Sequence, residues 1–155
     1  MKGSAKVLDH LQKLLNGELA ARDQYLAHSR IYQDWGLNEL FERLNHEMEE
    51  ETEHADDLIQ RMLFLEVTPD MNQKDAVRVG SNVQEMLHND LAVEYEVTAA
   101  LKSAISVCEE EQDYDTRKIL IKLLDDTEMD HAYWLEKQLG LIDKVGLQNY
   151  IQSKM

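Results

Sequence analysis

Helix-breaking residues are scarce in this chain, and that scarcity limits the folds open to it. The 155 residues include a single proline, Pro69, and only 6 glycines. Average usage would supply about 8 prolines and about 11 glycines in a chain of this length. Because proline and glycine interrupt helices, a chain with so few of them favours long helices.

Apolar residues recur at the spacing of an α-helix along most of the chain. From Val7 to Leu19 they recur at steps of three and four, which predicts a helix over about residues 5–34 that ends at Trp35 and Gly36. Comparable stripes define three further helices, and they run over residues 37–62, 83–105 and 119–139.

The segments between these stripes predict the topology. Residues 66–81 lose the pattern and hold the only proline, so we expect a long connection there, with Ser81 or Asn82 as the cap of the next helix. A short break is expected over 112–115, the last long helix is expected to stop at Gly140, and a short fifth helix is expected over 146–151. Two short loops and one long connection predict an all-α four-helix bundle with a single crossover, in one domain over residues 1–155.

Composition narrows the classes of partner. The 31 acidic and 16 basic residues give a formal net charge of −15, which would repel nucleic acid and anionic membranes. The longest apolar run, Met62 to Leu65, is too short to cross a bilayer, and no apolar signal segment follows Met1, so a cytoplasmic location is expected. Cys108 is the only cysteine, which excludes an intrachain disulfide, a cysteine-based zinc site and an iron–sulfur cluster.

Six titratable residues interrupt the apolar faces of the predicted helices. Each hairpin carries one inward Glu on its first helix and an inward Glu-x-x-His on its second; the residues are Glu18, Glu51 and His54, then Glu94, Glu128 and His131. The two inward glutamates are 33 residues apart in the first hairpin (51 − 18) and 34 in the second (128 − 94). Because both hairpins are antiparallel, these similar offsets place all six residues at one height in the bundle.

Buried groups of this kind point to a metal site. Four ionised carboxylates in a core would carry four negative charges at a large desolvation cost, and two divalent cations would balance them. Glu and His at i and i+3 share a helix face and can reach the same metal pair. Carboxylates with one imidazole per metal suit iron or manganese better than metals that prefer thiolates.

Several other titratable residues lie outside this set of six, and each has its own interpretation. Glu85 and His88 form a third Glu-x-x-His, but they have no partner at a matching height and are interpreted as a solvated pair. Tyr25 lies seven residues after Glu18, so it is predicted either to hydrogen-bond a ligand, to supply an electron, or simply to pack in the core. The acidic run HEMEEETEHADD at 46–57 leaves Glu47, Glu50 and Glu53 for a cation-attracting surface.

Five motifs carry a resemblance that runs essentially end to end. They are MKG at 1–3, GELAARDQY at 17–25, YQDWGL at 32–37, HADD at 54–57 and GLQNY at 146–150. In order and spacing the chain resembles the bacterioferritins and the closely related bacterial ferritins, whose fold is the ferritin-like bundle. The resemblance implies a ferroxidase subunit of a 24-subunit shell, which oxidises Fe(II) with dioxygen or peroxide and stores ferric mineral for iron detoxification.

The same resemblance implies roles for individual residues. Two iron ions per subunit would be bridged by Glu51 and Glu128, with Glu18 and His54 completing one iron and Glu94 and His131 the other. His46 and Glu50 match cavity-side positions where some members bind a further iron. A ferredoxin that donates electrons for iron release is a further partner implied by the family.

Two departures from the family pattern leave alternatives open. Bacterioferritins bind haem through a methionine at the position of Thr52, which cannot act as that ligand, and Met48 one turn earlier is the only nearby substitute. The chain is therefore either a haem-free homo-oligomer or a subunit that co-assembles with a paralogue that binds haem b. An extra residue around 127–130 could alter the geometry at Glu128 and His131.

Other functions fit the same bundle. A di-manganese catalase or a di-iron oxygenase would use a similar ligand set, although no apolar substrate pocket is evident in the sequence. A passive shell subunit or an acidic interaction bundle would bind no metal pair tightly.

Overall fold

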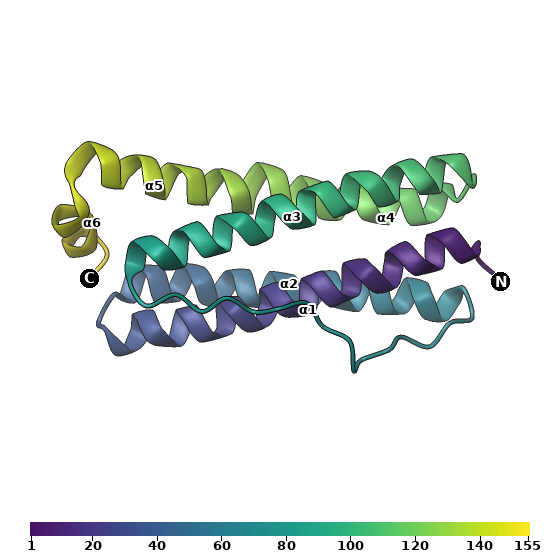
Figure 1. Cartoon of the computed structure of the whole chain (residues 1–155), viewed down its shortest axis with the longest axis horizontal. Helices are drawn as coiled ribbons and strands as arrows, with labels where there is room; N and C mark the ends of the chain where they lie inside the picture. The colour runs from purple at the N-terminus through teal and green to yellow at the C-terminus, as the bar shows by residue number, and fades with distance from the viewer.

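Four long helical rods build the molecule, and the computed structural model describes all of residues 1–155. Three rods are single helices, namely α1 (Ala5–Asp34), α2 (Asn38–Phe64) and α3 (Val83–Glu110). The fourth rod joins three segments and precedes a short last helix: α4 (Tyr114–Asp125), the π-helix η1 (Asp126–Ala132), α5 (Tyr133–Val145) and then α6 (Leu147–Ser153). Figure 1 shows the rods side by side, with α6 at the end of the bundle where α5 finishes. The predicted all-α four-helix bundle with one crossover and a short fifth helix is confirmed.

Side chains cap the starts of three helices. Of the two candidate caps for α3, Asn82 is the one used, because its side-chain oxygen accepts a 2.9 Å hydrogen bond from the amide of Glu85. Asp113 accepts a 3.0 Å bond from the amide of Thr116 and caps α4. The break predicted over 112–115 is therefore shorter at its far end, since α4 begins at Tyr114 directly after this cap.

The prediction that the last long helix stops at Gly140 is wrong. The helix continues to Val145 and stops at Gly146, whose φ of +85° is a conformation that favours glycine. A glycine inside an exposed helical turn costs only about 1 kcal/mol relative to alanine. Packing of Leu135 and Ile142 on either side of Gly140 buries both side chains and outweighs that cost.

The crossover runs along the bundle between α2 and α3 (Figure 1), and buried hydrogen bonds fasten it there. The amides of Arg78 and Gly80 donate to Gln24 Oε1 and His28 Nε2, each at 3.0 Å. Since His28 Nε2 accepts this bond, its Nδ1 carries the proton and donates to Asp90 Oδ1 at 2.8 Å. Gln24 donates to the same Asp90 oxygen at 2.8 Å. The crossover, α1 and α3 are thus tied together through buried hydrogen bonds.

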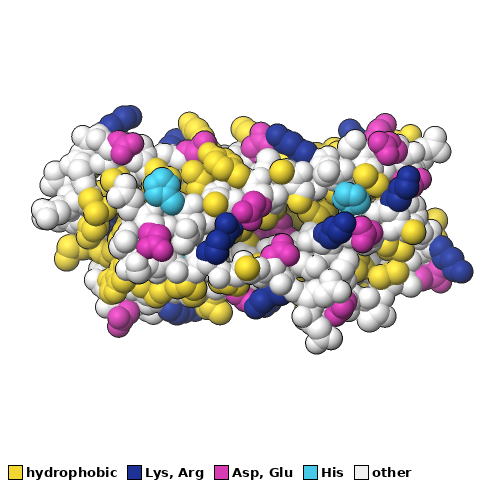
Figure 2. Space-filling view, in the orientation of Figure 1, with side chains coloured by type: hydrophobic (Ala, Val, Ile, Leu, Met, Phe, Trp, Pro, Cys, Tyr) yellow, Lys and Arg dark blue, Asp and Glu magenta, His cyan; other side chains and the backbone are white.

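Apolar side chains fill the bundle, and a group of buried acids and histidines interrupts them near its middle. No helix is both long enough and apolar enough to cross a membrane. The outer surface mixes acidic, basic and apolar side chains, as Figure 2 shows for one face. Large apolar residues exposed on the isolated chain include Trp35, Leu63, Phe64 and Tyr133.

Candidate metal centre

Five of the six predicted ligands meet inside the bundle. They come from α1, α2, α3 and η1 and are all nearly inaccessible to solvent: Glu18, Glu51, His54, Glu94 and His131. One ligand atom from each of Glu18, Glu51 and His54 lies within 4.8 Å of the others, and the same holds for Glu51, Glu94 and His131. Glu51 belongs to both groups, so its carboxylate lies between two adjacent ligand sets.

The two imidazoles present the same ring nitrogen to this cluster. The rings of His54 and His131 are nearly parallel, with centroids 5.9 Å apart and an interplanar angle of 20°. His54 Nδ1 lies 3.2 Å from Glu18 Oε2, and His131 Nδ1 lies 3.0 Å from Glu51 Oε1. Each ring therefore has Nδ1 toward the buried carboxylates and Nε2 directed away from them.

Several atoms in this cluster are buried without a hydrogen bond. They are Glu18 Oε1, Glu51 Oε2, Glu94 Oε2 and His131 Nδ1. A buried polar atom that lacks a partner destabilises a protein by about 1–3 kcal/mol, so four in one place indicate that something else binds there. Divalent cations would satisfy all four atoms, and oxygen donors with one imidazole per metal fit iron.

Without a metal, protons on the histidines balance the carboxylates. Burial by itself lowers the pKa of His54, but its bonds with Glu18 and Glu51 outweigh this effect and raise the pKa to about 11. His131 has its pKa raised in the same way by contacts with four carboxylates, against the effect of burial. Burial and the charge of Glu51 raise the pKa of Glu18 well above its usual range and that of Glu94 to about 7. Metal binding must therefore displace protons from this site.

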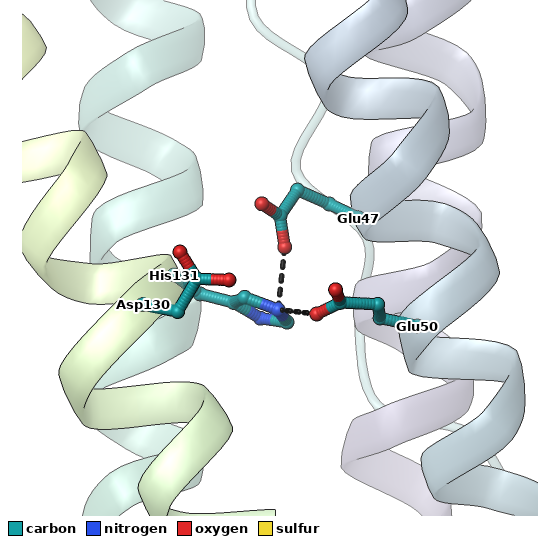
Figure 3. Close-up of side chains that lie close together, drawn as sticks. All are labelled: Glu47, Glu50, Asp130 and His131. Carbon is teal, nitrogen blue, oxygen red and sulfur yellow. Dashed lines mark hydrogen bonds and ion pairs between the residues drawn. The ribbon is translucent and has the colours of Figure 1, made fainter.

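A second group of charged residues surrounds the outer nitrogen of His131. Figure 3 shows Glu47 and Glu50 reaching from α2 toward His131 on η1, with Asp130 beside it. His131 Nε2 lies 2.5 Å from Glu47 Oε2 and 2.6 Å from Glu50 Oε2. The guanidinium of Arg43 forms ion pairs with Glu47 at 2.6 Å and with Asp130 at 2.9 Å, so its single positive charge offsets part of their negative charge. A carboxylate on the outer nitrogen holds the tautomer in which Nδ1 can bind metal.

The expectation that Glu47 lies on the surface is wrong, because its side chain is buried against His131. A sequence signal for this existed, since Glu47 lies four residues before Glu51 and seven before His54 on the same helix face. The spacing arguments also missed Asp126, whose Oδ2 lies 3.0 Å from His54 Nε2 and hydrogen-bonds His54 as Glu50 hydrogen-bonds His131. No spacing pattern pointed to Asp126, because the π-helical geometry places it there.

The expectation that Glu128 faces inward is also wrong. Its side chain is 47% exposed and pairs with Lys102 Nζ at 3.3 Å. Three residues turn an α-helix through about 300°, which keeps Glu128 within about 60° of His131. A π-helix has about 4.4 residues per turn, so three residues cover only about 245° and separate the two side chains by about 115°. The π-helical winding of η1 therefore moves Glu128 off the face that His131 occupies.

An extra residue in the fourth rod accounts for this winding. Between the buried residues Leu123 and Leu135, the buried positions advance in three steps of four, through Thr127 and His131. Three turns of an α-helix take about 11 residues, whereas 12 are present here (135 − 123). The extra residue predicted around 127–130 is thus accommodated as a π-helix, and Thr127 takes the inward position expected for Glu128.

The remaining predicted site residues lie close to the centre. Tyr25 is buried, and its hydroxyl donates to Glu94 Oε1, which matches the first of the three roles left open for it: a hydrogen bond to a predicted ligand. His46 is exposed, and its Nε2 lies 2.6 Å from Glu50 Oε1. Thr52 is exposed and donates to the carbonyl of Met48, whose side chain packs against the core. A role for Met48 in haem binding stays a prediction.

Residues 8–145 match the family model described as the ferritin-like domain. The chain belongs to the ferritin family. This ferritin is 65% identical to a protein named "Bacterial ferritin" from Synechocystis sp. over 155 residues, which cover all of this chain and 99% of the relative. It is 57% identical to the "Bacterial ferritin" of Pseudomonas aeruginosa over the full length of both chains. A "Bacterioferritin" from Brucella melitensis is 39% identical over 98% of this chain and 94% of the relative.

Membership of the family identifies iron as the substrate of this protein. This ferritin is an iron-storage protein whose general chemistry is the oxidation of iron, and ferritins usually assemble into shells. The buried carboxylates and histidines provide the residues that could bind this iron.

Proposed function

We propose that this chain is a ferroxidase subunit that binds two Fe(II) ions side by side as its substrate. The observation that carries the proposal is the place of Glu51 in two adjacent ligand groups, with Glu18 and His54 on one side and Glu94 and His131 on the other. One shared carboxylate between two sites can bridge two metal ions. The proposal treats residues 1–155 as one ferritin-like domain, with Glu128 as the sixth ligand of the pair.

The surrounding residues prepare the pair for oxidation. Asp126 accepts a hydrogen bond from the outer nitrogen of His54, and Glu50 accepts one from the outer nitrogen of His131, so that each Nδ1 faces the iron site. Tyr25 donates to Glu94 and holds that carboxylate in place. Two Fe(II) ions release one electron each. With dioxygen as the oxidant, the two electrons and two protons give hydrogen peroxide. With hydrogen peroxide as the oxidant, the two electrons and two protons give two water molecules.

Membership of the ferritin family also suggests the product of the reaction and the assembly of the subunits. Fe(III) would hydrolyse and enter a mineral inside a shell of 24 subunits, passing His46 and Glu50 on the cavity side. Thr52 in place of a methionine favours a subunit that lacks its own haem ligand, either in a homo-oligomer or together with a haem-binding paralogue. Iron release would use electrons from a ferredoxin-like donor.

A double variant tests the site. Replacing Glu51 and His54 by alanine removes the shared carboxylate and one imidazole, so the fast phase of Fe(II) oxidation, followed by stopped-flow absorbance, should disappear. Glu53→Ala is the matched control, because Glu53 is an exposed acid on the same helix, and it should keep that phase. A fast phase of unchanged rate in the double variant, with its helical content retained, contradicts the assignment.

A further inference from the structure

Glu128 is held outside the centre by only a weak contact. Its partner Lys102 is 59% exposed, Glu128 itself is 47% exposed, and their charged atoms are 3.3 Å apart. Exposed ion pairs of this kind contribute little to stability because water and salt screen them. Moving Glu128 away from Lys102 therefore costs little free energy, and a stronger partner would offset that cost.

The residue in the inward position is poorly satisfied. Thr127 is fully buried, and its hydroxyl oxygen has no hydrogen-bond partner. A threonine hydroxyl can both donate and accept, so its burial without a partner is unfavourable. The arrangement of η1 thus places a polar group in the core while a carboxylate of the predicted set is exposed to water.

Metal binding gives a reason for the opposite arrangement. Glu18, Glu51 and Glu94 direct three negative charges at the two metal positions, whereas two divalent cations bring four positive charges. The nearby carboxylates of Glu47 and Asp126 face the outer nitrogens of His131 and His54 instead, and Glu47 is paired with Arg43. A fourth carboxylate directed at the metal positions is therefore lacking, and Glu128 is the remaining member of the predicted set that can supply it.

The backbone can move Glu128 without unfolding the rod. Leu123 and Leu135 fix the rotation of the helix on either side, so the extra residue must be taken up somewhere between them. It lies at present in η1, over Asp126–Ala132. If the π-helical turn lay nearer to Leu123, residues 128–131 would be α-helical, and Glu128 would lie on the same face as His131.

We propose that binding of two divalent metal ions shifts the π-helical turn toward α4, exchanging Thr127 for Glu128 at the metal centre. Glu128 leaves Lys102 and becomes a ligand, while the Thr127 hydroxyl turns toward water. Because of the extra residue, Glu128 joins the other ligands only in the metal-bound form. This inference deepens the proposed function and rests on it.

Hydrogen–deuterium exchange with Zn(II) tests the shift, because Zn(II) is divalent and undergoes no oxidation. The full-length protein, stripped with a chelator, is compared with the same protein after two Zn(II) per chain, and calorimetry gives the stoichiometry and affinity. We expect the exchange of amides 124–132 to change on loading in the wild type and to stay unchanged in Glu128→Gln. Glu109→Gln is the matched control, since Glu109 is an exposed acid paired with Arg117, and it should behave as the wild type.

Two further variants should move the affinity in opposite directions. Lys102→Met removes the outer partner of Glu128 and should tighten Zn(II) binding about two- to fivefold, the range that a surface ion pair represents. Lys122→Met, which removes a similarly exposed pair with Asp57, should leave the affinity unchanged. Thr127→Val removes a buried hydroxyl that destabilises the form in which Thr127 faces inward and Glu128 faces outward. That form becomes more stable relative to the metal-bound form, so Zn(II) binding should weaken several-fold.

The outcomes separate this inference from the proposed function. If two Zn(II) bind with no change of exchange in 124–132, and Glu128→Gln binds them with wild-type affinity, the shift is overturned while the metal centre stands. If the wild type binds no Zn(II) at the centre, both proposals are overturned. If Lys102→Met and Thr127→Val shift the affinity in the same direction, the exchange of Thr127 for Glu128 is overturned.

Discussion

Buried tyrosines illustrate how one hydroxyl can be tied to the metal centre while another is not. Tyr25 and Tyr32 both lie on α1 and are both almost completely buried. The Tyr25 hydroxyl donates to Glu94, whereas the Tyr32 hydroxyl has no hydrogen-bond partner. Burial raises the pKa of both phenols, and the negative charge of Asp90 adds to the rise in each; Tyr25 also faces the negative charge of Glu94. Tyr25 therefore stays protonated and remains a hydrogen-bond donor.

Substituting these tyrosines by phenylalanine should separate the two roles. Tyr25→Phe leaves Glu94 Oε1 without its donor in a buried site, so the metal-free protein should lose about 1–3 kcal/mol of stability. Tyr32→Phe removes a hydroxyl that has no partner, and its stability should stay the same or rise slightly. Urea unfolding of both metal-stripped variants checks this pair, and equal stabilities would contradict the proposed function of the Tyr25 hydrogen bond.

At the scale of elements, specific hydrogen bonds hold the crossover against the bundle. Its amides at Arg78 and Gly80 reach Gln24 and His28 on α1, and Asp90 on α3 binds both of these side chains. A Cβ at Gly80 would lie only 2.8 Å from the backbone nitrogen of Met86, so this close approach requires glycine. The connection, which looks irregular in sequence, is thus a fixed part of the bundle.

Changes at Asp90 should loosen this connection. Asp90→Ala leaves the donors on His28 and Gln24 buried without an acceptor, so the protein should lose about 2–4 kcal/mol, and the crossover should be cleaved faster by thermolysin. Asp90→Asn retains the acceptor oxygen and replaces Oδ2, which has no partner, so it should behave much closer to the wild type. Equal cleavage rates in the two variants would show that the network does not hold the crossover.

For the whole molecule, charge and exposed apolar area describe a subunit suited to assembly around iron. The net charge of −15 favours cations over nucleic acid, and iron is the substrate of the family. Large apolar residues such as Trp35, Phe64 and Tyr133 are about half exposed on the isolated chain, on a surface where charges of both signs are interspersed (Figure 2). Because ferritins usually assemble into shells, we expect some of these residues to lie at contacts between subunits.

Assembly can be measured directly. Size-exclusion chromatography with light scattering should give a mass near 24 × 18.0 kDa. A visible spectrum of the same sample should show a Soret band only if haem is bound through a residue other than Thr52. A monomer or dimer in solution would contradict the shell and favour the catalase or oxygenase alternative.

Periodicity and the positions of breakers predicted most of the bundle. Helix α1 has the predicted bounds, the crossover lies where Pro69 and the loss of pattern placed it, and Glu18, Glu51, His54, Glu94 and His131 meet as their spacing indicated. These predictions succeed because burial repeats regularly on helices whose interiors contain no proline. The prediction that the last long helix ends at Gly140 failed, because the packing of neighbouring turns outweighs the small loss of helix stability that one glycine causes.

Only the tertiary structure decided where the extra residue of the fourth rod would be taken up. Every turn between Leu123 and Leu135 could hold it with similar backbone hydrogen bonding, so local sequence expresses no strong preference. Packing of Leu123 and Leu135 fixes the total rotation of the helix between them, and the charges around His54 and His131 determine where the π-helical turn lies. The amino-acid sequence by itself determined that carboxylates and histidines would be buried together, while tertiary contacts determined that Glu128 stays outside and that Glu47, Asp126 and Arg43 surround the two histidines.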